Sequence, residues 1–268
     1  MLCGQHGQDH VINVFDRNNI AEVRDVIPLP GMHPTTIAAC SISNCVYVCN
    51  VDLEEFSNSD SVLRITKTEK QLYTMSSWIT DIQLKLRNIS VSDHGSLITL
   101  SSYPGLASVY SFVRIYAANG FLQHGVLLFH REVGLSSVDN VILKSNGNFI
   151  FVSDNSRSLT DSPHQTKLVE TDMFGVLIRR YQSQLGGEVS VYLADNYDRI
   201  IITSWHGTYE LLDSELNRLA FTRLEPLEGQ LCISSKLHIN TERNEIMRIY
   251  GSLFTSTRIL SIFRLIYE

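Results

Sequence analysis

The sequence predicts an all-β fold built from repeated, four-stranded antiparallel sheets. The first observation is the unit from Pro34 to Trp78, in which four short runs rich in β-branched and aromatic residues alternate with turn formers. The second is that Val46 and Val48, like Ile98 and Leu100, stand two residues apart, a period that fits strands and not helices. The third is that the unit repeats along the chain.

The repeat is most regular at the second strand of each unit. These strands start at Cys45, Ser96, Asn148, Arg199 and Glu245, at intervals of 51, 52, 51 and 46 residues. An apolar first strand precedes each of them, at Ile37–Ser41, Ile89–Ser92, Val141–Lys144, Val191–Ala194 and Leu237–Asn240. The corners between first and second strands are rich in Asn, Asp and Gly, which accept positive φ and favour tight hairpins.

Repeats of about 40 to 50 residues that each form one four-stranded sheet predict a β-propeller. Third strands number six, near residues 12, 63, 113, 168, 209 and 262, whereas first and fourth strands number five each. Six blades explain these numbers if the first blade lacks its inner strand and the last lacks its outer strand. Five blades, with the two terminal strands sharing one sheet, are the alternative and leave one third strand over. Either arrangement predicts a single domain over residues 1–268.

Composition limits the partners and the compartment. A net charge of −6 disfavours a protein that mainly grips the phosphates of nucleic acid. No apolar run reaches the length of a membrane span, and residues 1–7 lack the features of a signal peptide. The five cysteines are an odd number and are not spaced like a disulfide framework. We therefore expect a cytoplasmic protein with reduced thiols and no membrane association.

One unit resembles a known repeat family. Pro34-Thr-Thr-Ile-Ala38, Asn44-Cys-Val-Tyr-Val-Cys-Asn50 and Val62-Leu-Arg-Ile65 are similar to the NHL repeats of β-propellers, and Asp154 gives a second copy of the strand end. The whole chain also resembles invertebrate propeller proteins without an assigned function. The resemblance implies a six-bladed fold that binds protein or RNA, and that in a minority of relatives performs metal-assisted chemistry.

Candidate metal ligands have simpler explanations. Cys40, Cys45 and Cys49 form the densest cysteine cluster, but zinc needs a fourth ligand, so we interpret them as buried packing residues. Four oxygen donors at or after second strands are typical of turn capping as well as of calcium binding. These are Asp52, Asp60, Asp154 and Asn155. No Gly-x-Ser-x-Gly motif is present, and we assign no catalytic residue, cofactor or metal site.

The candidate binding surface consists of the loops between second and third strands. Several are long, at residues 51–60, 102–111, 154–165 and 251–258, and they should open on one face. Aromatic residues on neighbouring loops would flank the loop at 154–165. The candidate binding residues are Tyr103, Tyr110, Asp154, Asn155, Arg157, Trp205 and His206.

These features predict a non-catalytic scaffold that binds a protein partner through the loops of one face. One alternative is a metal-dependent hydrolase or lyase with its ion at the channel mouth. The other is single-stranded RNA binding, which the acidic balance of the chain disfavours. The RNA alternative is suggested by a run of basic residues beside Tyr73 and Trp78. We interpret this run as a solvated outer-strand edge. The run contains Arg64, Lys67, Lys70, Lys85 and Arg87.

Overall fold

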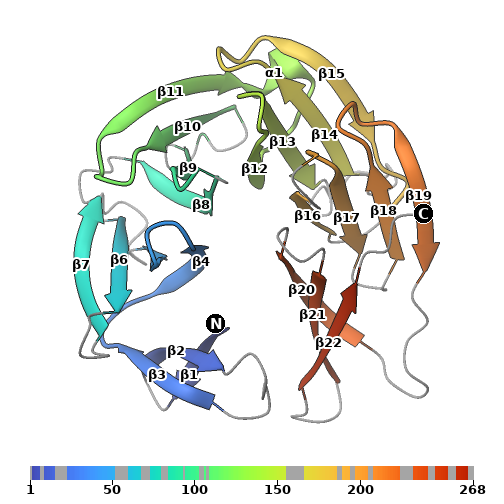
Figure 1. The fold of residues 1–268 in the computed structure, drawn as a ribbon. Helices are drawn as coiled ribbons and strands as arrows, with labels where there is room; N and C mark the ends of the chain where they lie inside the picture. Colours follow the sequence, from blue (N-terminus) through green and yellow to red (C-terminus); the bar gives the residue numbers. More distant parts are fainter. Residues whose placement is uncertain are drawn as a thin grey trace. The chain divides into compact units, whose positions relative to one another are not determined.

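A computed structural model gives the structure, which divides into two compact units, Met1–Leu128 and Phe129–Glu268 (Figure 1). It describes residues 2–6, 9–15, 23–51, 60–67, 73–79, 84–92, 94–102, 106, 109–154, 166–185, 189–193, 197–204, 208–223, 232–240, 245–252 and 258–264. Apart from the four-residue helix α1, the regular structure in these ranges consists of strands. The predicted all-β class is confirmed.

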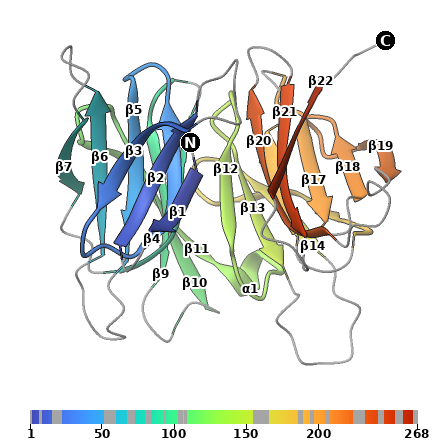
Figure 2. The same ribbon diagram turned by 90° about the horizontal axis from the view of Figure 1, so that it is seen from below.

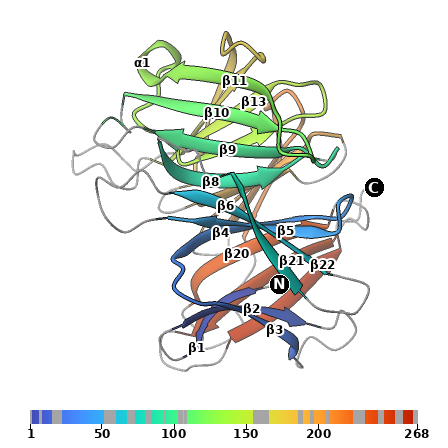
Figure 3. The ribbon, with the colours of Figure 1, turned by 90° about the vertical axis from the view of Figure 1, so that its left-hand side faces the viewer.

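Unit 1 contains three antiparallel sheets, which follow one another in Figure 3. The first sheet consists of β1 (Leu2–His6), β2 (Asp9–Phe15) and β3 (Val23–Leu29). The second consists of β4 (Pro34–Cys40), β5 (Cys45–Asn50), β6 (Ser61–Lys67) and β7 (Tyr73–Ile79). The third consists of β8 (Lys85–Val91), β9 (Leu97–Ser102), β10 (Tyr110–Tyr116) and β11 (Leu122–Phe129). In each sheet the strands pair in chain order.

Unit 2 begins with α1 (His130–Val133) and continues with three further sheets. The fourth sheet consists of β12 (Asn140–Leu143), β13 (Phe149–Asp154), β14 (Thr166–Thr171) and β15 (Leu177–Gln182). The fifth consists of β16 (Val189–Leu193), β17 (Ile200–Ser204), β18 (Thr208–Leu212) and β19 (Arg218–Arg223). The sixth consists of β20 (Cys232–Asn240), β21 (Glu245–Ser252) and β22 (Arg258–Arg264), which lie side by side in Figure 2.

The strand repeat matches the prediction closely. The second strands of the second to sixth sheets begin at the predicted residue or one residue later. Among the described strands, the first and last sheets have three strands each and the other four sheets have four. In the first sheet the predicted third strand, β2, pairs with one strand on each side, so the described strands of this sheet correspond to the second, third and fourth strands of a unit. The number of blades in a closed propeller stays a prediction.

Burial on both faces holds neighbouring sheets together. Every residue of β9 and β17 is buried, and so are the first five residues of β5. Ile12, Leu29 and Val48 belong to a cluster between the first and second sheets, and Tyr47 and Leu97 to one between the second and third. In unit 2 an equivalent cluster joins the fourth and fifth sheets. At about 25 cal/mol per Å² of apolar area, this packing dominates the stability of each unit.

The corners between strands repeat a backbone conformation that the sequence predicts. Four of the corners between first and second strands contain a residue with positive φ: Asn44 (44°), Gly95 (80°), Gly147 (87°) and Asp198 (57°). These are the Asn, Asp and Gly positions singled out in the sequence. The turns between third and fourth strands follow the same principle with Gly120 (88°) and Gly175 (86°).

Leu216 breaks this rule. It has φ of 63° in the β18–β19 turn, and its N–H donates to the carbonyl of Asp213, as the N–H of Gly175 does to that of Asp172. A left-handed conformation costs a residue with Cβ about 1–2 kcal/mol. Leu216 is nevertheless buried in the cluster between the fourth and fifth sheets, so packing of its side chain offsets the strain.

This balance can be tested by two substitutions. Leu216→Ala should lower the free energy of unfolding by about 2–4 kcal/mol, because it removes the packing and keeps the strain. Leu216→Gly removes the same side chain but relieves the strain, so it should be less destabilising than Leu216→Ala by about 1 kcal/mol. Denaturant titrations of both variants measure the difference, and a glycine variant no more stable than the alanine variant would contradict the explanation.

Candidate functional site

Most of the predicted loop residues lie outside the part of the chain that the structure describes. These are Tyr103, Asn155, Arg157, Trp205 and His206. Asp154 is described only as the last residue of β13. Tyr110 begins β10, is half-buried, and makes an edge contact with Phe112 at a ring-centroid distance of 5.7 Å. The predicted recognition surface on these loops stays a prediction.

The basic run is not the outer-strand edge that the sequence suggested. Arg64 and Lys67 lie on β6, which is between β5 and β7, whereas Lys85 and Arg87 lie on β8, the inner strand of the next sheet. Lys70 lies outside the described residues. The interpretation failed because the residues are close in sequence but belong to different sheets.

Asp60 neutralises part of this run. The carboxylate of Asp60 is buried, accepts a hydrogen bond of 2.7 Å from the N–H of Leu86, and lies 3.5 Å from Nζ of Lys85. Asp60 precedes β6, so these contacts join the second sheet to β8. Its oxygens therefore serve as a structural link between neighbouring sheets.

The three clustered cysteines are buried, as the packing interpretation predicts. Cys40 and Cys45 are directly opposite each other on β4 and β5, and both pack with Cys49 in the cluster between the second and third sheets. Burial raises the pKa of the Cys49 thiol, although hydrogen bonds from Thr35 and Thr36 oppose the shift. Within the described ranges, no three His, Cys, Asp or Glu residues are grouped as metal ligands.

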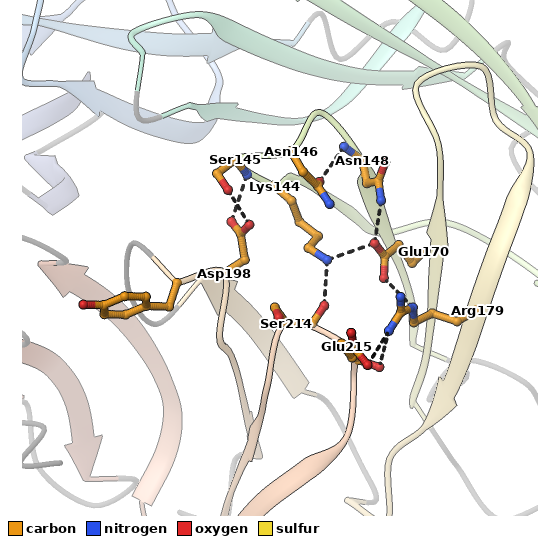
Figure 4. Close-up of a pocket in the computed structure, with 10 residues that line it drawn as sticks. Lys144, Ser145, Asn146, Asn148, Glu170, Arg179, Asp198, Ser214 and Glu215 are labelled. Atoms are coloured by element: carbon orange, nitrogen blue, oxygen red, sulfur yellow. Dashed lines mark hydrogen bonds and ion pairs between the residues drawn. The ribbon is translucent and has the colours of Figure 1, made fainter. Parts of the chain in front are cut away.

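The structure instead forms a polar pocket of about 240 Å³ where the fourth and fifth sheets meet (Figure 4). It is built from the β12–β13 corner, the strands β14 and β15, the corner before β17 and the β18–β19 turn. Its lining residues are Lys144, Ser145, Asn146, Asn148, Glu170, Arg179, Tyr197, Asp198, Ser214 and Glu215. In an antiparallel meander these corners lie at one end of the strands, and the long predicted loops lie at the other.

A buried ion pair forms the base of the pocket. Nζ of Lys144 lies 2.9 Å from Oε1 of Glu170 and donates a hydrogen bond of 2.7 Å to the carbonyl of Ser214. Asn148 donates to the same Oε1 at 2.7 Å. On the other side, Oε2 of Glu170 lies 3.0 Å from Nε of Arg179, without the alignment of a hydrogen bond. Lys144 thus connects the fourth sheet to a turn of the fifth.

The rim of the pocket also connects the two sheets. The carboxylate of Asp198 accepts hydrogen bonds from the N–H of Ser145 (2.9 Å) and from its hydroxyl (2.6 Å). Arg179 donates to the carbonyl of Glu215 at 2.9 Å and lies 3.7 Å from its carboxylate. Tyr197 is 77% exposed at the edge, with the guanidinium of Arg199 5.6 Å from its ring centre.

A second buried carboxylate, Glu210 of β18, lies between the same two sheets. It accepts hydrogen bonds from the hydroxyls of Tyr181 and Ser183, both at 2.5 Å, and lies 3.7 Å from Nη1 of Arg218. Burial and the hydrogen bond to Glu210 raise the pKa of Tyr181, so its phenol stays a donor. Glu210 therefore joins the fourth and fifth sheets directly, whereas Glu170 does so through Lys144.

The pocket was not predicted from the sequence, although the β12–β13 corner that forms part of it follows a predicted first strand, Val141–Lys144. The sequence feature that could have indicated the pocket is a charged residue within an apolar strand. Examples are Lys144 after Val-Ile-Leu, Glu170 after Leu-Val, and Glu210 after Tyr209. Lys, Glu and Asp are almost never fully buried unless they are paired. A charged residue in a run that should be buried on both faces therefore indicates an ionic partner on the neighbouring sheet.

Comparison with known proteins identifies the fold class. No family model matches the chain, and no curated protein matches it. A solved structure described as "YCF48 bound to D1 peptide" is 9% identical, with a TM-score of 0.55 over 97% of this chain and 73% of that one. At this identity the likeness concerns the fold alone, and together with the antiparallel sheets it supports a propeller fold for this chain. No helix among the described residues is long and apolar enough to span a membrane.

The ion pair at the base of the pocket predicts a large loss of stability for one substitution. Lys144→Met leaves Glu170 buried without its closest cation, which should cost about 3–5 kcal/mol. Adding Glu170→Gln to this variant removes the uncompensated charge and should recover part of the loss. Denaturant unfolding of the single and double variants provides the test. Losses that simply add would show that the two side chains are not coupled.

The β18–β19 turn predicts a pH dependence. Partial burial would raise the pKa of Asp213, but hydrogen bonds from Asn217 and Glu215 and the charge of Arg179 hold it below its ordinary value. Its contribution to stability is therefore present above the unfolded pKa and is lost as pH falls through the folded one. Asp213→Asn should destabilise the protein at neutral pH and make no difference near about pH 2. Thermal melts across this range measure it, and a difference that persists in acid would contradict the assignment.

Proposed function

We propose that this chain is a non-catalytic, protein-binding β-propeller of six blades and NHL-like repeats. We further propose that its two units form one domain and that it acts in the cytoplasm. The fold supports the first proposal, and so does the solved propeller described as bound to a peptide. The observation that carries the proposal is the pocket between the fourth and fifth sheets, where the buried charges are already held by protein groups.

The contacts at the pocket favour recognition over catalysis. Lys144 and Glu170 are bound to each other, and Asp198 is engaged by two donors from Ser145. A general acid or base must be able to reach a substrate proton, whereas these groups are oriented toward their partners in the chain. Such fixed pairs give a rigid, preorganised rim, and rigidity lowers the entropy cost of binding a peptide.

The charges indicate which side chain of a partner enters the pocket. The lining contains three carboxylates and two cations. The side chain of Glu215 is 69% exposed, and the ring of Tyr197 already attracts one guanidinium. A lysine or arginine of the partner would pair with Glu215 and lie against Tyr197, since a cation over an aromatic face contributes about 0.5–1 kcal/mol at exposed sites.

A random peptide library displayed on phage and selected on the full chain tests this function. Selected peptides should be enriched in lysine and arginine. Their affinity should fall about tenfold or more with Tyr197→Ala combined with Glu215→Gln, since the loss of one ionic and one aromatic contact amounts to about 1.4 kcal/mol or more. Arg180→Glu, outside the pocket lining, serves as the matched control and should leave this affinity unchanged.

Two results would contradict the pocket as the binding surface. Failure to select any peptide would count against protein binding itself. Peptides that bind the pocket variant normally, but lose affinity when Tyr103, Arg157 and Trp205 are changed together to alanine, would place recognition on the loops at the other ends of the strands. In that case the sequence-based surface, which also includes Tyr110, Asp154, Asn155 and His206, would be the functional one.

A further inference from the structure

The outer edge of the fourth sheet carries a run of exposed apolar residues. β15 is the last strand in the order β12-β13-β14-β15, so one side of its backbone pairs with no strand in the described part of the chain (Figure 1). The β14–β15 turn and the start of β15 read Met173-Phe-Gly-Val-Leu-Ile178. All five large side chains in this run are exposed, with Phe174 at 72% and Val176 at 63%. We call residues 173–180 the apolar edge.

The turn that presents these side chains is well defined. Oδ1 of Asp172 accepts hydrogen bonds of 2.9 Å from the N–H groups of Phe174 and Val176, and the N–H of Asp172 donates to the carbonyl of Val176. Gly175 supplies the left-handed residue, with φ of 86°. The apolar side chains are therefore held on a hydrogen-bonded turn, which reduces the entropy that a partner must remove.

Equivalent turns in the same chain show that an apolar tip is not required by the fold, although the β10–β11 turn also ends on an exposed apolar residue, Phe121 (74%). The turns at Ala117–Phe121 and Asp213–Asn217 have the same backbone hydrogen bonds as the turn at Asp172–Val176. The two tip residues are Met173-Phe174 in the turn at Asp172–Val176, but Ala118-Asn119 and Ser214-Glu215 in the other two turns. Long, exposed, apolar sheet edges favour association and are usually blunted. The exposed run at this edge therefore indicates an interaction surface.

The charges on the strand select the partner. Arg179 and Arg180 are the two central residues of Leu177–Gln182. If β15 strands from two copies of the chain paired antiparallel about their centres, arginine would lie opposite arginine, which is unfavourable. Arg180 is exposed, lies against Gly134 and has no ion pair with another described residue. The edge thus disfavours a second copy and favours an acidic strand.

We propose that the apolar edge binds an extended segment of a partner protein that carries an apolar and an acidic residue two positions apart, by adding it as a strand beside β15. Backbone hydrogen bonds to the free side of β15 supply affinity, as in other cases of strand addition. Because Ile178 and Arg180 lie on the same face of the strand, the partner presents an apolar and an acidic side chain two residues apart on that face. Phe174 and Val176 extend the apolar contact. This surface contains neither Tyr197 nor Glu215 and shares only Arg179 with the lining of the pocket.

The probe is a second phage-displayed library of eight-residue random peptides, selected on the full chain in the presence of excess soluble pocket peptide. Selected sequences should contain Asp or Glu two positions away from an apolar residue. The combined variant Met173→Ala and Phe174→Asn gives the β14–β15 turn the two tip residues of the β10–β11 turn. Because that turn has the same backbone hydrogen bonds, the variant should fold normally. It should weaken the selected synthetic peptides at least tenfold, and Arg180→Glu should do the same. Tyr197→Ala with Glu215→Gln is the control and should leave their affinity unchanged.

Three outcomes would overturn the proposal. The first is that the selected peptides lack acidic residues or bind both edge variants normally. The second is that their affinity falls only with the pocket variant, which would assign them to the pocket. The third is a wild-type dimer in sedimentation that the Met173→Ala and Phe174→Asn variant dissociates, because this would make a second copy of the chain the occupant. Circular dichroism of each variant should match the wild type, and if the turn variant is misfolded, Arg180→Glu alone decides the result.

Discussion

The constraint on which the structure depends is that its central strands are buried on both faces. Strands such as β9 and β17 have no solvent-facing residue, so both faces of these strands must be covered. A sheet of this kind cannot be stable alone, which is why sheets repeat along the chain and pack against one another within each unit. The same constraint limits where function can lie. Only the corners at the strand ends and the outer strands remain open to a partner, and these are the places where the pocket and the apolar edge occur.

Apolar packing alone would let two twisted sheets slide past each other, because it has no direction. Between the fourth and fifth sheets, directional contacts oppose this. Glu170 of the fourth sheet is joined through Lys144 to the carbonyl of Ser214 in the fifth, and Glu210 of the fifth sheet accepts from Tyr181 and Ser183 of the fourth. The carboxylate of Glu210 thus reaches the other sheet directly, whereas Glu170 reaches it through Lys144. We infer that these pairs fix the lateral position of the sheets, and that the pocket is the open end of this arrangement.

The sheets could be predicted from the sequence and the pocket could not, and the difference has a physical reason. Strands and corners are local: a two-residue period and an Asn, Asp or Gly at a corner act within about ten residues, so residues such as Gly147 and Asp198 could be assigned directly. The pocket joins Lys144, Asp198 and Ser214, which come from three corners up to 70 residues apart. Their proximity depends on how sheets stack, and a single sequence does not record it. Met173–Ile178 follows the third strand predicted near residue 168, but its exposure depends on β15 being an edge.

Arg179 is the residue at which the two surfaces meet. Its backbone belongs to β15, and its guanidinium lies between the carboxylates of Glu170 and Glu215 in the pocket. A strand added to β15 would order the backbone that carries this guanidinium, and a cation bound at Glu215 would compete with it for the same carboxylate. Any effect of one partner on the affinity of the other would therefore pass through a residue that both use, and thermodynamic linkage requires that effect to be equal in both directions. The two surfaces are chemically different, one polar and concave and the other apolar and linear, yet the fold connects them through a single arginine.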